Sequence, residues 1–294
     1  MHPPGPRGHN PNSLGCRKDG ALVSRRDPLI EIVRDGVELI ELGQPFFTGM
    51  PCSPNHPGFR MTLIRRHGDM VRSDGGSAAN EIIVTGGHVG THIDALSHVS
   101  HDGLLHGGVD AAAAQRGGAF TTHGAEHLPG LLRRGVLLDV AGLHDVETLP
   151  GGYEITAEDL RRAAKQAEVQ PESGDVALIR TGWSRLFDDR DAYLGTASGV
   201  PGVGVEAARW LAERGVVATG SDTTAYERIA PGAGHSVLPV HRILLVEAGI
   251  FILEHLALEA LAEAGRTEFV FLLAPLRIVG GTGSPVRPLA AVTR

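Results

Sequence analysis

The chain has 294 residues, a formal net charge of −7 at pH 7, 42% hydrophobic residues and 21% charged residues. This balance is ordinary for a globular protein with a sizeable core, and the negative charge gives no electrostatic reason to expect nucleic acid or an anionic membrane as a partner. No apolar run approaches the ~20 residues that span a bilayer. Two cysteines, Cys16 and Cys52, are too few for a disulfide framework, so we expect a reducing, cytoplasmic setting.

The beginning of the chain differs in composition from the rest. Residues 1–20, MHPPGPRGHNPNSLGCRKDG, are rich in Pro, Gly, Asn and Arg and contain no apolar core of the signal-peptide kind. We therefore predict a disordered leader over residues 1–36 and one folded domain over residues 37–294.

Short runs rich in Val, Ile and Leu recur along this domain and predict β-strands. They cover residues 37–42, 61–66, 80–86, 135–142, 175–182, 215–221, 250–256 and 268–276. Helical patterns lie between the later runs: residues 156–168 begin with a Thr cap, 204–215 end in Gly, and 239–249 open with Pro and end in Gly. A strand-rich first half followed by alternating strands and helices predicts an α/β or α+β domain.

Residues 86–98, GGHVGTHIDALSH, concentrate His88, His92, Asp94 and His98 in one short segment. Its glycines and β-branched residues make a poor helix, so we expect a strand next to a tight loop. Alternate residues of a strand share a side, which points His92 and Asp94 the same way, and the glycine before them lets His88 converge. Two imidazoles and a carboxylate suit Zn²⁺ or Mn²⁺, and His98 is placed to act as a general acid/base.

A second candidate cluster lies in residues 241–256, HRILLVEAGIFILEHL. Glu254 shares a face of the predicted strand with Ile250 and Ile252, and a carboxylate among apolar residues is costly to bury unless it is paired or binds a metal. A salt bridge to an arginine explains the same pattern, so both interpretations stay open. His255 is expected to point the opposite way.

Other patterns in the sequence are weaker indications of a functional site. A lone histidine more often satisfies backbone groups of a loop than binds a metal, and His123 and His127 lie in such a polar segment. His235 and Ser236 are a candidate second polar pair of the site. GGHVGTH lacks the lysine and glycine spacing of a phosphate-binding loop. The chain has no G-x-S-x-G motif, and neither cysteine lies in a thiol-nucleophile motif.

The segment HVGTHIDALSH resembles the H-x-G-T-H-x-D-x-P-x-H signature of the metal-dependent cyclase family, which includes bacterial kynurenine formamidase and isatin hydrolase. The resemblance extends over most of residues 37–294. It includes the segments ELGQPFFTGMPCSPNHPGF, LIRTGW, GSDTTAYE, PVHRILLVEAGIFILEHL and GTGSPVRP.

The resemblance implies a compact α/β domain around a mixed, barrel-like sheet with flanking helices, assembled as a homodimer or homotetramer. It also implies site residues: His88, His92 and Asp94 for one metal ion, Asp94, His241 and Glu254 for a second, and His98 as general acid/base. Members of the family use Zn²⁺ or Mn²⁺ to hydrolyse amide-type bonds. The expected activity is therefore metal-dependent hydrolysis of a small cyclic or N-acyl amide of the lactam or formamide type.

Two positions depart from the family pattern. Leu96 stands where the signature usually has Pro, and Ser53 stands where kynurenine formamidases, as aligned, carry a substrate-stacking Trp. The loss of that aromatic platform argues against N-formylkynurenine as the substrate. The alternatives are a lactonase, a cyclase or dehydratase on a natural-product route, and a non-catalytic metal or small-molecule binding protein. His98 argues against the last, because a purely structural site needs no free base.

Overall fold

The structure is a computed structural model that describes residues 27–293. Contacts divide the chain after Val37, and each part is described by itself. The first part contains helix α1 (Pro28–Asp35), which begins with an aspartate cap and a proline, two residues that favour a helix start. The leader expected to be disordered over residues 1–36 thus includes a helical segment, and its first 26 residues lie outside the described part of the chain.

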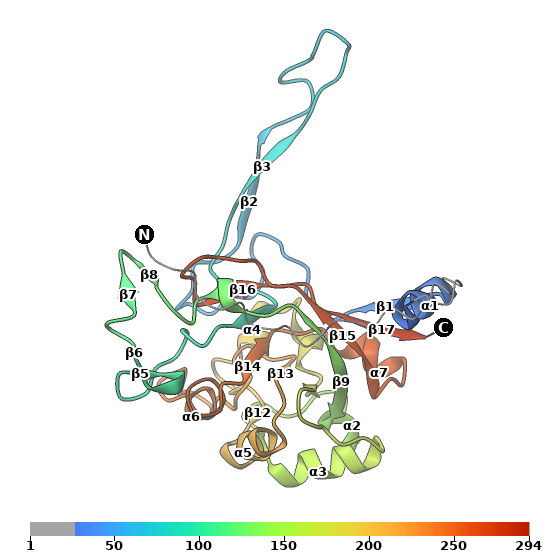
Figure 1. The fold of residues 1–294 in the computed structure, drawn as a ribbon, viewed down its shortest axis with the longest axis vertical. Helices are drawn as coiled ribbons and strands as arrows, with labels where there is room; N and C mark the ends of the chain where they lie inside the picture. The colour runs from blue at the N-terminus through green and yellow to red at the C-terminus, as the bar shows by residue number, and fades with distance from the viewer. Residues whose placement is uncertain (1–26, 294) are drawn as a thin grey trace, which may run out of the picture. The chain divides into compact units, whose positions relative to one another are not determined.

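The second part is built around one nine-stranded mixed sheet (Figure 1). In spatial order its strands are β1 (Val37–Glu41), β17 (Leu289–Thr293), β15 (Glu268–Leu273), β9 (Leu131–Asp139), β11 (Val176–Arg180), β13 (Ala218–Ser221), β14 (Phe251–Glu254), β4 (His92–Asp94) and β16 (Gly283–Pro285). Strands β9, β11, β13 and β14 are parallel to one another, and β15 and β4 on either side of them run antiparallel. The parallel strands require crossover connections, which the helices supply.

The two faces of the sheet pack into two cores. One core holds Ile179 and Ile252 together with side chains of α2, α3, α5, α6 and η4, and the other holds Leu178 and Leu253 together with α7. Neighbouring residues of a strand enter opposite cores, as the two-residue period requires. The helices are α2 (Val140–Leu143), α3 (Ala157–Gln166), α4 (Arg190–Leu194), α5 (Val205–Arg214), α6 (Pro239–His241), the π-helix η4 (Arg242–Ala248) and α7 (Glu259–Glu263).

The remaining strands form separate two-stranded pairs. These are β2 (Arg60–Arg65) with β3 (Asn80–Val84), β5 (Leu104–Leu105) with β6 (Val109–Asp110), β7 (Gln115–Arg116) with β8 (Ala119–Phe120), and β10 (Glu154–Ile155) with β12 (Gly202–Val203). The single-turn 3-10 helices are η1 (His106–Gly108), η2 (Ala125–His127) and η3 (Trp183–Leu186). None of the helices in the described residues is both long and apolar enough to cross a bilayer.

Each of the eight apolar runs contains a strand, but two predicted elements differ from the structure. The strand predicted over residues 135–142 ends at Asp139, because the carboxylate of this residue accepts a hydrogen bond from the N–H of Gly142 (2.8 Å) and caps α2. The helix predicted over residues 239–249 is one α-helical turn followed by the π-helix η4. Such π-helical turns recur at functional sites.

Helix α3 begins with a reciprocal capping box. The hydroxyl of Thr156 accepts from the N–H of Asp159 (3.1 Å), and the carboxylate of Asp159 accepts from the N–H of Thr156 (2.9 Å). His144 and Tyr153 also hydrogen-bond this carboxylate. Burial acts to raise the pKa of Asp159, but these hydrogen bonds outweigh it and lower the pKa.

We expect Thr156→Ala and Asp159→Ala each to lower the free energy of unfolding by about 1 kcal/mol, the usual cost of a lost cap. Because the folded pKa of Asp159 lies below the unfolded value of ~3.9, its contribution is complete above that pH and is lost as the pH falls through the folded pKa. Urea unfolding at neutral and acidic pH measures both effects. Glu158→Ala is the control, since Glu158 makes only an exposed ion pair with Arg161 (3.7 Å); equal destabilisation by this variant would contradict the capping account.

Candidate metal centre

The register of two neighbouring strands assembles the centre of the site. Strands β4 and β14 are antiparallel, and His92 lies directly opposite Glu254. Opposite residues of such a pair project to the same face, and Asp94 shares that face because it lies two residues after His92. The Nε2 atom of His92 is 3.5 Å from Asp94 Oδ1 and 3.5 Å from Glu254 Oε2. All three side chains are buried.

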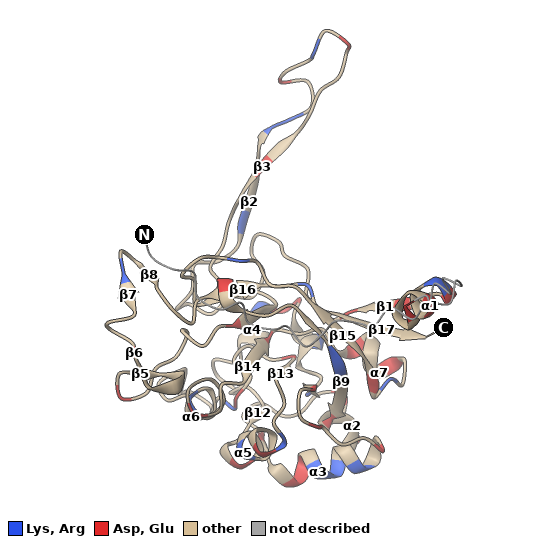
Figure 2. Cartoon of the chain, in the orientation of Figure 1, with Lys and Arg blue, Asp and Glu red and all other residues tan. Residues whose placement is uncertain are grey.

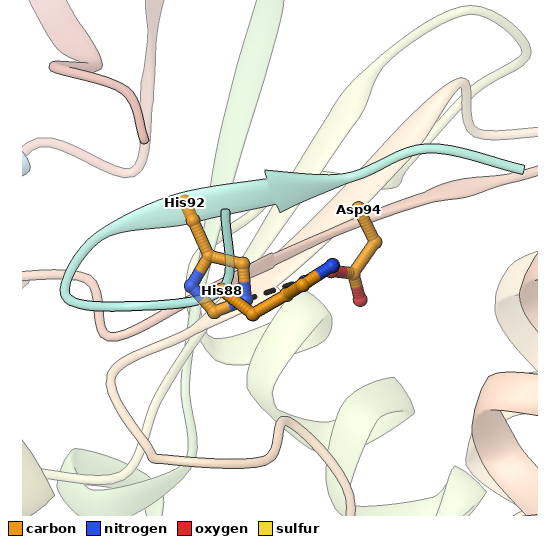
Figure 3. A group of neighbouring side chains, drawn as sticks. All are labelled: His88, His92 and Asp94. Carbon is orange, nitrogen blue, oxygen red and sulfur yellow. Dashed lines mark hydrogen bonds and ion pairs between the residues drawn. The ribbon is translucent and has the colours of Figure 1, made fainter. Parts of the chain in front are cut away.

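His88 reaches the same carboxylate from the loop before β4. Its Nδ1 lies 2.7 Å from Asp94 Oδ1, and its Nε2 lies 2.8 Å from the hydroxyl of Thr282. Figure 3 shows the rings of His88 and His92 and the carboxylate of Asp94 converging. This packing requires a glycine in β16, because a Cβ atom on Gly283 would lie 2.5 Å from Cε1 of His88.

His241 approaches the two carboxylates from α6. Its Nε2 is 3.2 Å from Glu254 Oε1 and 3.7 Å from Asp94 Oδ2. Its Nδ1 is 2.6 Å from the carboxylate of Glu227, which also accepts from the backbone N–H groups of Val240 and His241. Glu227 therefore accepts a hydrogen bond from Nδ1–H and turns Nε2 toward the carboxylates of Asp94 and Glu254, which is how metal-binding histidines are commonly oriented.

His98 lies beside these groups. Its ring stacks on that of His88, with centroids 3.8 Å apart. A ring nitrogen of His98, a carboxylate oxygen of Asp94 and a ring nitrogen of His241 all lie within 4.8 Å of one another. Hydrogen bonds hold the rings of His88, His92 and His241, whereas none joins the ring of His98 to another residue among 27–293.

The environment lowers the pKa of some histidines of the site and raises that of another. Burial and the neighbouring imidazoles lower the pKa of His98 to about 3, and they also lower the pKa values of His56 and His255. These rings are therefore neutral at pH 7. Burial acts in the same direction on His241, but its carboxylate partners outweigh burial and raise the pKa of this residue to about 10.

The donor set fits a divalent cation. Atom Oδ2 of Asp94 is buried and has no hydrogen-bond partner among the described residues. A buried anionic oxygen is costly unless a charge compensates it. Possible ligand atoms lie within 4.8 Å of one another in two groups of three residues that share His92. One group is His88, His92 and Asp94, and the other is His92, Glu254 and His255. Mixed imidazole and carboxylate donors suit Zn²⁺ or Mn²⁺.

The cluster opens into a cavity of about 230 Å³. Its lining residues are Ser53, Asn55, His56, His88, His98, Thr224, Ala225, His235, Leu238, His241, Glu254 and His255. A second cavity, of about 260 Å³, shares Ser53, Asn55, Thr224 and His235 with the first. The second cavity is largely apolar beyond these residues and is lined by Leu194, Val200 and Ile229 among others. A small molecule with a polar end and an apolar body matches this pair of cavities.

The structure brings together the predicted metal-ligand residues and His98, which are His88, His92, Asp94, His98, His241 and Glu254. It differs from the prediction at His255 and at Ser236. His255 was expected to point away from Glu254, but its ring nitrogen lies in the cluster with His92 and Glu254. The two-residue alternation stops there, because β14 ends at Glu254 and His255 has a φ of +55°. Of the candidate polar pair, His235 lines the cavity, whereas Ser236 hydrogen-bonds the carbonyl of Ala233 and does not line it.

Two residues of the site escaped the sequence reasoning. Glu227 is the last residue of the family-like segment GSDTTAYE, but no role was assigned to it there, and no periodicity marks it as buried. His56 lies in the family-like loop PCSPNHPGF, where a histidine flanked by prolines is a signal that could have been used. Both positions depend on loop conformation, which hydrophobic patterns do not encode.

The fold and the site define an α/β protein with a mixed, barrel-like sheet and a buried histidine–carboxylate centre, which confirms the fold class implied by the resemblance. The sequence model of the family described as putative cyclase matches residues 40–228, and the chain belongs to this family.

Its relatives include isatin hydrolases. The isatin hydrolase of Roseibium aggregatum is 28% identical over 227 residues, which cover 76% of this chain and 78% of that protein. The crystal structure of a novel cyclase matches with a TM-score of 0.79 and 29% identity, over 89% of this chain and 91% of that one. Isatin hydrolase A from Labrenzia aggregata, bound to benzyl benzoate, matches with a TM-score of 0.69 and 25% identity, over 91% and 100% of the two chains. The chain is thus an isatin hydrolase-like member of the cyclase family.

We expect the reconstituted protein to retain a divalent transition metal through dialysis, and His92→Ala and Asp94→Asn to lose it, because each removes a donor from the centre of the cluster. Elemental analysis measures the metal content. His123→Ala is the control, since its ring bonds the carbonyl of His106 (3.0 Å) outside the cluster. Wild-type protein that holds no transition metal, or an Asp94→Asn variant that keeps a full complement, would refute the assignment.

Glu227→Gln tests the orientation of His241. We expect it to weaken metal binding by roughly 10–100-fold, the usual effect of removing such a supporting partner. Competition with a chelator measures the affinity. The matched control is Glu126→Gln, because the carboxylate of Glu126 also accepts from a backbone N–H, that of Gly280 (2.8 Å). An equal loss in both variants would mean that Glu227 acts through general stability alone.

Proposed function

We propose that the chain is a metal-dependent hydrolase of a small cyclic or N-acyl amide, of the lactam or formamide type. The observation that carries this proposal is the buried Oδ2 of Asp94, which has no hydrogen-bond partner among the described residues, in a histidine–carboxylate cluster that opens into a cavity beside the ring of His98. The similarity to an isatin hydrolase supports C–N bond hydrolysis as the reaction class.

The proposed roles follow from the contacts of each residue. One ion would be held by His88, His92 and Asp94, and a second ion, sharing Asp94 with the first, would be held by Asp94, His241 and Glu254. Asp94 suits a bridging role because its Oδ1 faces His88 and His92, whereas its Oδ2 faces His241. Zn²⁺ and Mn²⁺ both accept such nitrogen and oxygen donors.

A cation bound by these residues supplies Lewis acidity, which acidifies water and polarises a carbonyl group. The chain's own contribution to proton transfer comes from His98. Its neutral ring accepts the proton released by the attacking water and returns it to the departing nitrogen. The ring is stacked on His88, so its position relative to the reacting bond is fixed.

The lining of the two cavities supports the proposed substrate class. The amide group faces the metal centre in the first cavity, and the body of the molecule extends past Ser53 into the second cavity against Leu194, Val200 and Ile229. Ser53 provides no aromatic platform, so this apolar lining supplies the contact area instead.

His98→Ala separates proton transfer from metal binding. We expect this variant to keep its metal and its fold while its rate falls by ~10²–10⁴-fold, because general acid/base help is lost. KM should change much less than kcat, since the lost interaction is made mainly in the transition state. The loss should be smaller for an amide with a good leaving group, which needs less protonation as it departs.

His88→Ala is the matched comparison, since it should lose metal and activity together. Metal content and rate are measured on both variants with an activated and an unactivated amide. If His98→Ala lost its metal as His88→Ala does, His98 would be a ligand and not the general acid/base. Parallel assays of a lactam, a formamide and a lactone distinguish amide hydrolysis from lactonase activity.

A further inference from the structure

A third cavity, of about 350 Å³, adjoins the cavity at the metal centre and is lined by two arginines. It shares Ser53 and His56 with the cavity at the metal centre, and Ser53 also lines the apolar second cavity. The three cavities therefore meet at the turn of residues 53–56, in which the N–H of His56 donates to the carbonyl of Ser53 (3.1 Å). A molecule held at the metal centre can extend from this turn into both of the other cavities.

The charged groups that line the third cavity are both cationic. They are Arg60 and Arg190, and no Asp or Glu of the described residues lines the cavity. Arg60 begins β2 at the end of the strand nearer the sheet, where the ribbon is blue in Figure 2, and Arg190 begins α4. Neither guanidinium forms a hydrogen bond or an ion pair with another residue in the described part of the chain. Both groups are therefore available to a ligand.

The lack of a lining carboxylate distinguishes the third cavity from another arginine-lined cavity. In a cavity of about 440 Å³ beside β9 and β15, Arg134 lies 2.9 Å from Asp175 and 3.2 Å from Glu268, so its charge is matched within the chain. The two charges of the third cavity have no such match, although the whole chain has a net charge of −7. A concave site of one sign attracts a ligand of the opposite sign.

The acidic neighbours of Arg190 in the sequence do not pair with it. Asp188, Asp189 and Asp191 flank this residue, but none of them forms an ion pair with it or lines the cavity. The carboxylate of Asp189 instead accepts from a backbone N–H of α4 (3.1 Å) and caps this helix. Burial raises the pKa of the Cys52 thiol and Arg190 only partly offsets this rise, so the thiol in the lining is uncharged at pH 7. The cavity thus presents two guanidinium groups and no anion.

We propose that the substrate amide carries a carboxylate, which Arg60 and Arg190 bind in the third cavity. This inference rests on the proposed function, because it places the amide of the same molecule at the metal centre. Guanidinium groups bind carboxylates through charge-assisted, often paired hydrogen bonds. With the apolar body in the second cavity, the simplest such molecule is an N-formyl amino acid with an apolar side chain. Its amide, side chain and carboxylate branch from one carbon atom, as the three cavities branch from the turn of residues 53–56.

Two formamides that differ only in the carboxylate test the proposal on the metal-reconstituted protein. We expect kcat/KM to be ~10-fold or more higher for N-formyl-L-leucine than for N-(3-methylbutyl)formamide, since hydrogen bonds to a charged group are worth about this factor. Arg60→Gln and Arg190→Gln should each remove most of the advantage. They should do so by raising KM for the formyl amino acid with little change in kcat, because the lost contact is remote from the reacting bond.

Arg116→Gln is the matched control, because Arg116 is exposed on β7 and lines none of the three cavities. This variant should leave kcat/KM unchanged for both formamides. Equal kcat/KM for the two formamides in the wild-type protein would overturn the proposal. So would Arg60→Gln and Arg190→Gln variants that lower kcat/KM for both formamides alike, since these arginines would then act through the general structure.

Calorimetric binding tests the carboxylate site without turnover. We expect the metal-reconstituted wild-type protein to bind 4-methylpentanoate more tightly than the uncharged 4-methylpentanamide, and Arg190→Gln to weaken binding of the carboxylate alone by ~10-fold. Equal binding of the two molecules by the wild type would overturn the proposal. Carboxylate binding that Arg60→Gln and Arg190→Gln leave unchanged would place the anion on the metal and overturn it too. Arginine-dependent binding by a protein that hydrolyses no amide would support the carboxylate site and refute the proposed function instead.

Discussion

The architecture depends on the burial of two carboxylates, Asp94 and Glu254, on the neighbouring strands β4 and β14. Buried anions are costly unless cations or donors surround them, and here His92 and His241 each lie close to both. The register between β4 and β14 creates this arrangement. A slip of one residue would turn His92 and Asp94 into the opposite core, where Ile93 now packs.

Two glycines near the centre allow the close packing of its side chains. Gly283 gives His88 room, and Gly90 adopts a φ of +62° where a Cβ atom would lie 2.6 Å from the ring of Phe46. Phe46 in turn packs edge-to-face on Phe59, with ring centroids 5.5 Å apart, and Phe59 immediately precedes β2. The loop that carries His88 and the segment that leads into β2 are therefore parts of one packed unit.

Much of the fold could be predicted from local patterns. Runs of Val, Ile and Leu marked the strands because the central strands are buried on both faces, and the Thr156 cap and the terminal glycines marked the helices. The spacing of His88, His92 and Asp94 was sufficient to predict a shared centre, because all three lie within one short segment. The exposed strands β2 and β3 are as rich in apolar residues as core strands, so sequence alone could not reveal that they form a separate exposed pair.

The rest of the site depends on contacts between distant segments. The sequence placed His241 in a second candidate cluster, but only the family resemblance joined it to Asp94, since nothing local brings the two together. The role of Glu227 could not be predicted, because it depends on the turn that brings its carboxylate to the backbone N–H and the ring of His241 in α6. His255 was misjudged because strand alternation was extended one residue too far, past the end of β14.

Anomalous diffraction from crystals of the metal-reconstituted protein, recorded at the absorption edge of the metal, tests the central claim most directly. The account predicts a peak among Asp94, His241 and Glu254, at about 2.0–2.2 Å from their nitrogen and oxygen ligand atoms. A second peak that shares Asp94, nearer His88, would identify the bridged pair of ions. Crystals that show only ordered water among these side chains, or a metal bound elsewhere, would contradict the account.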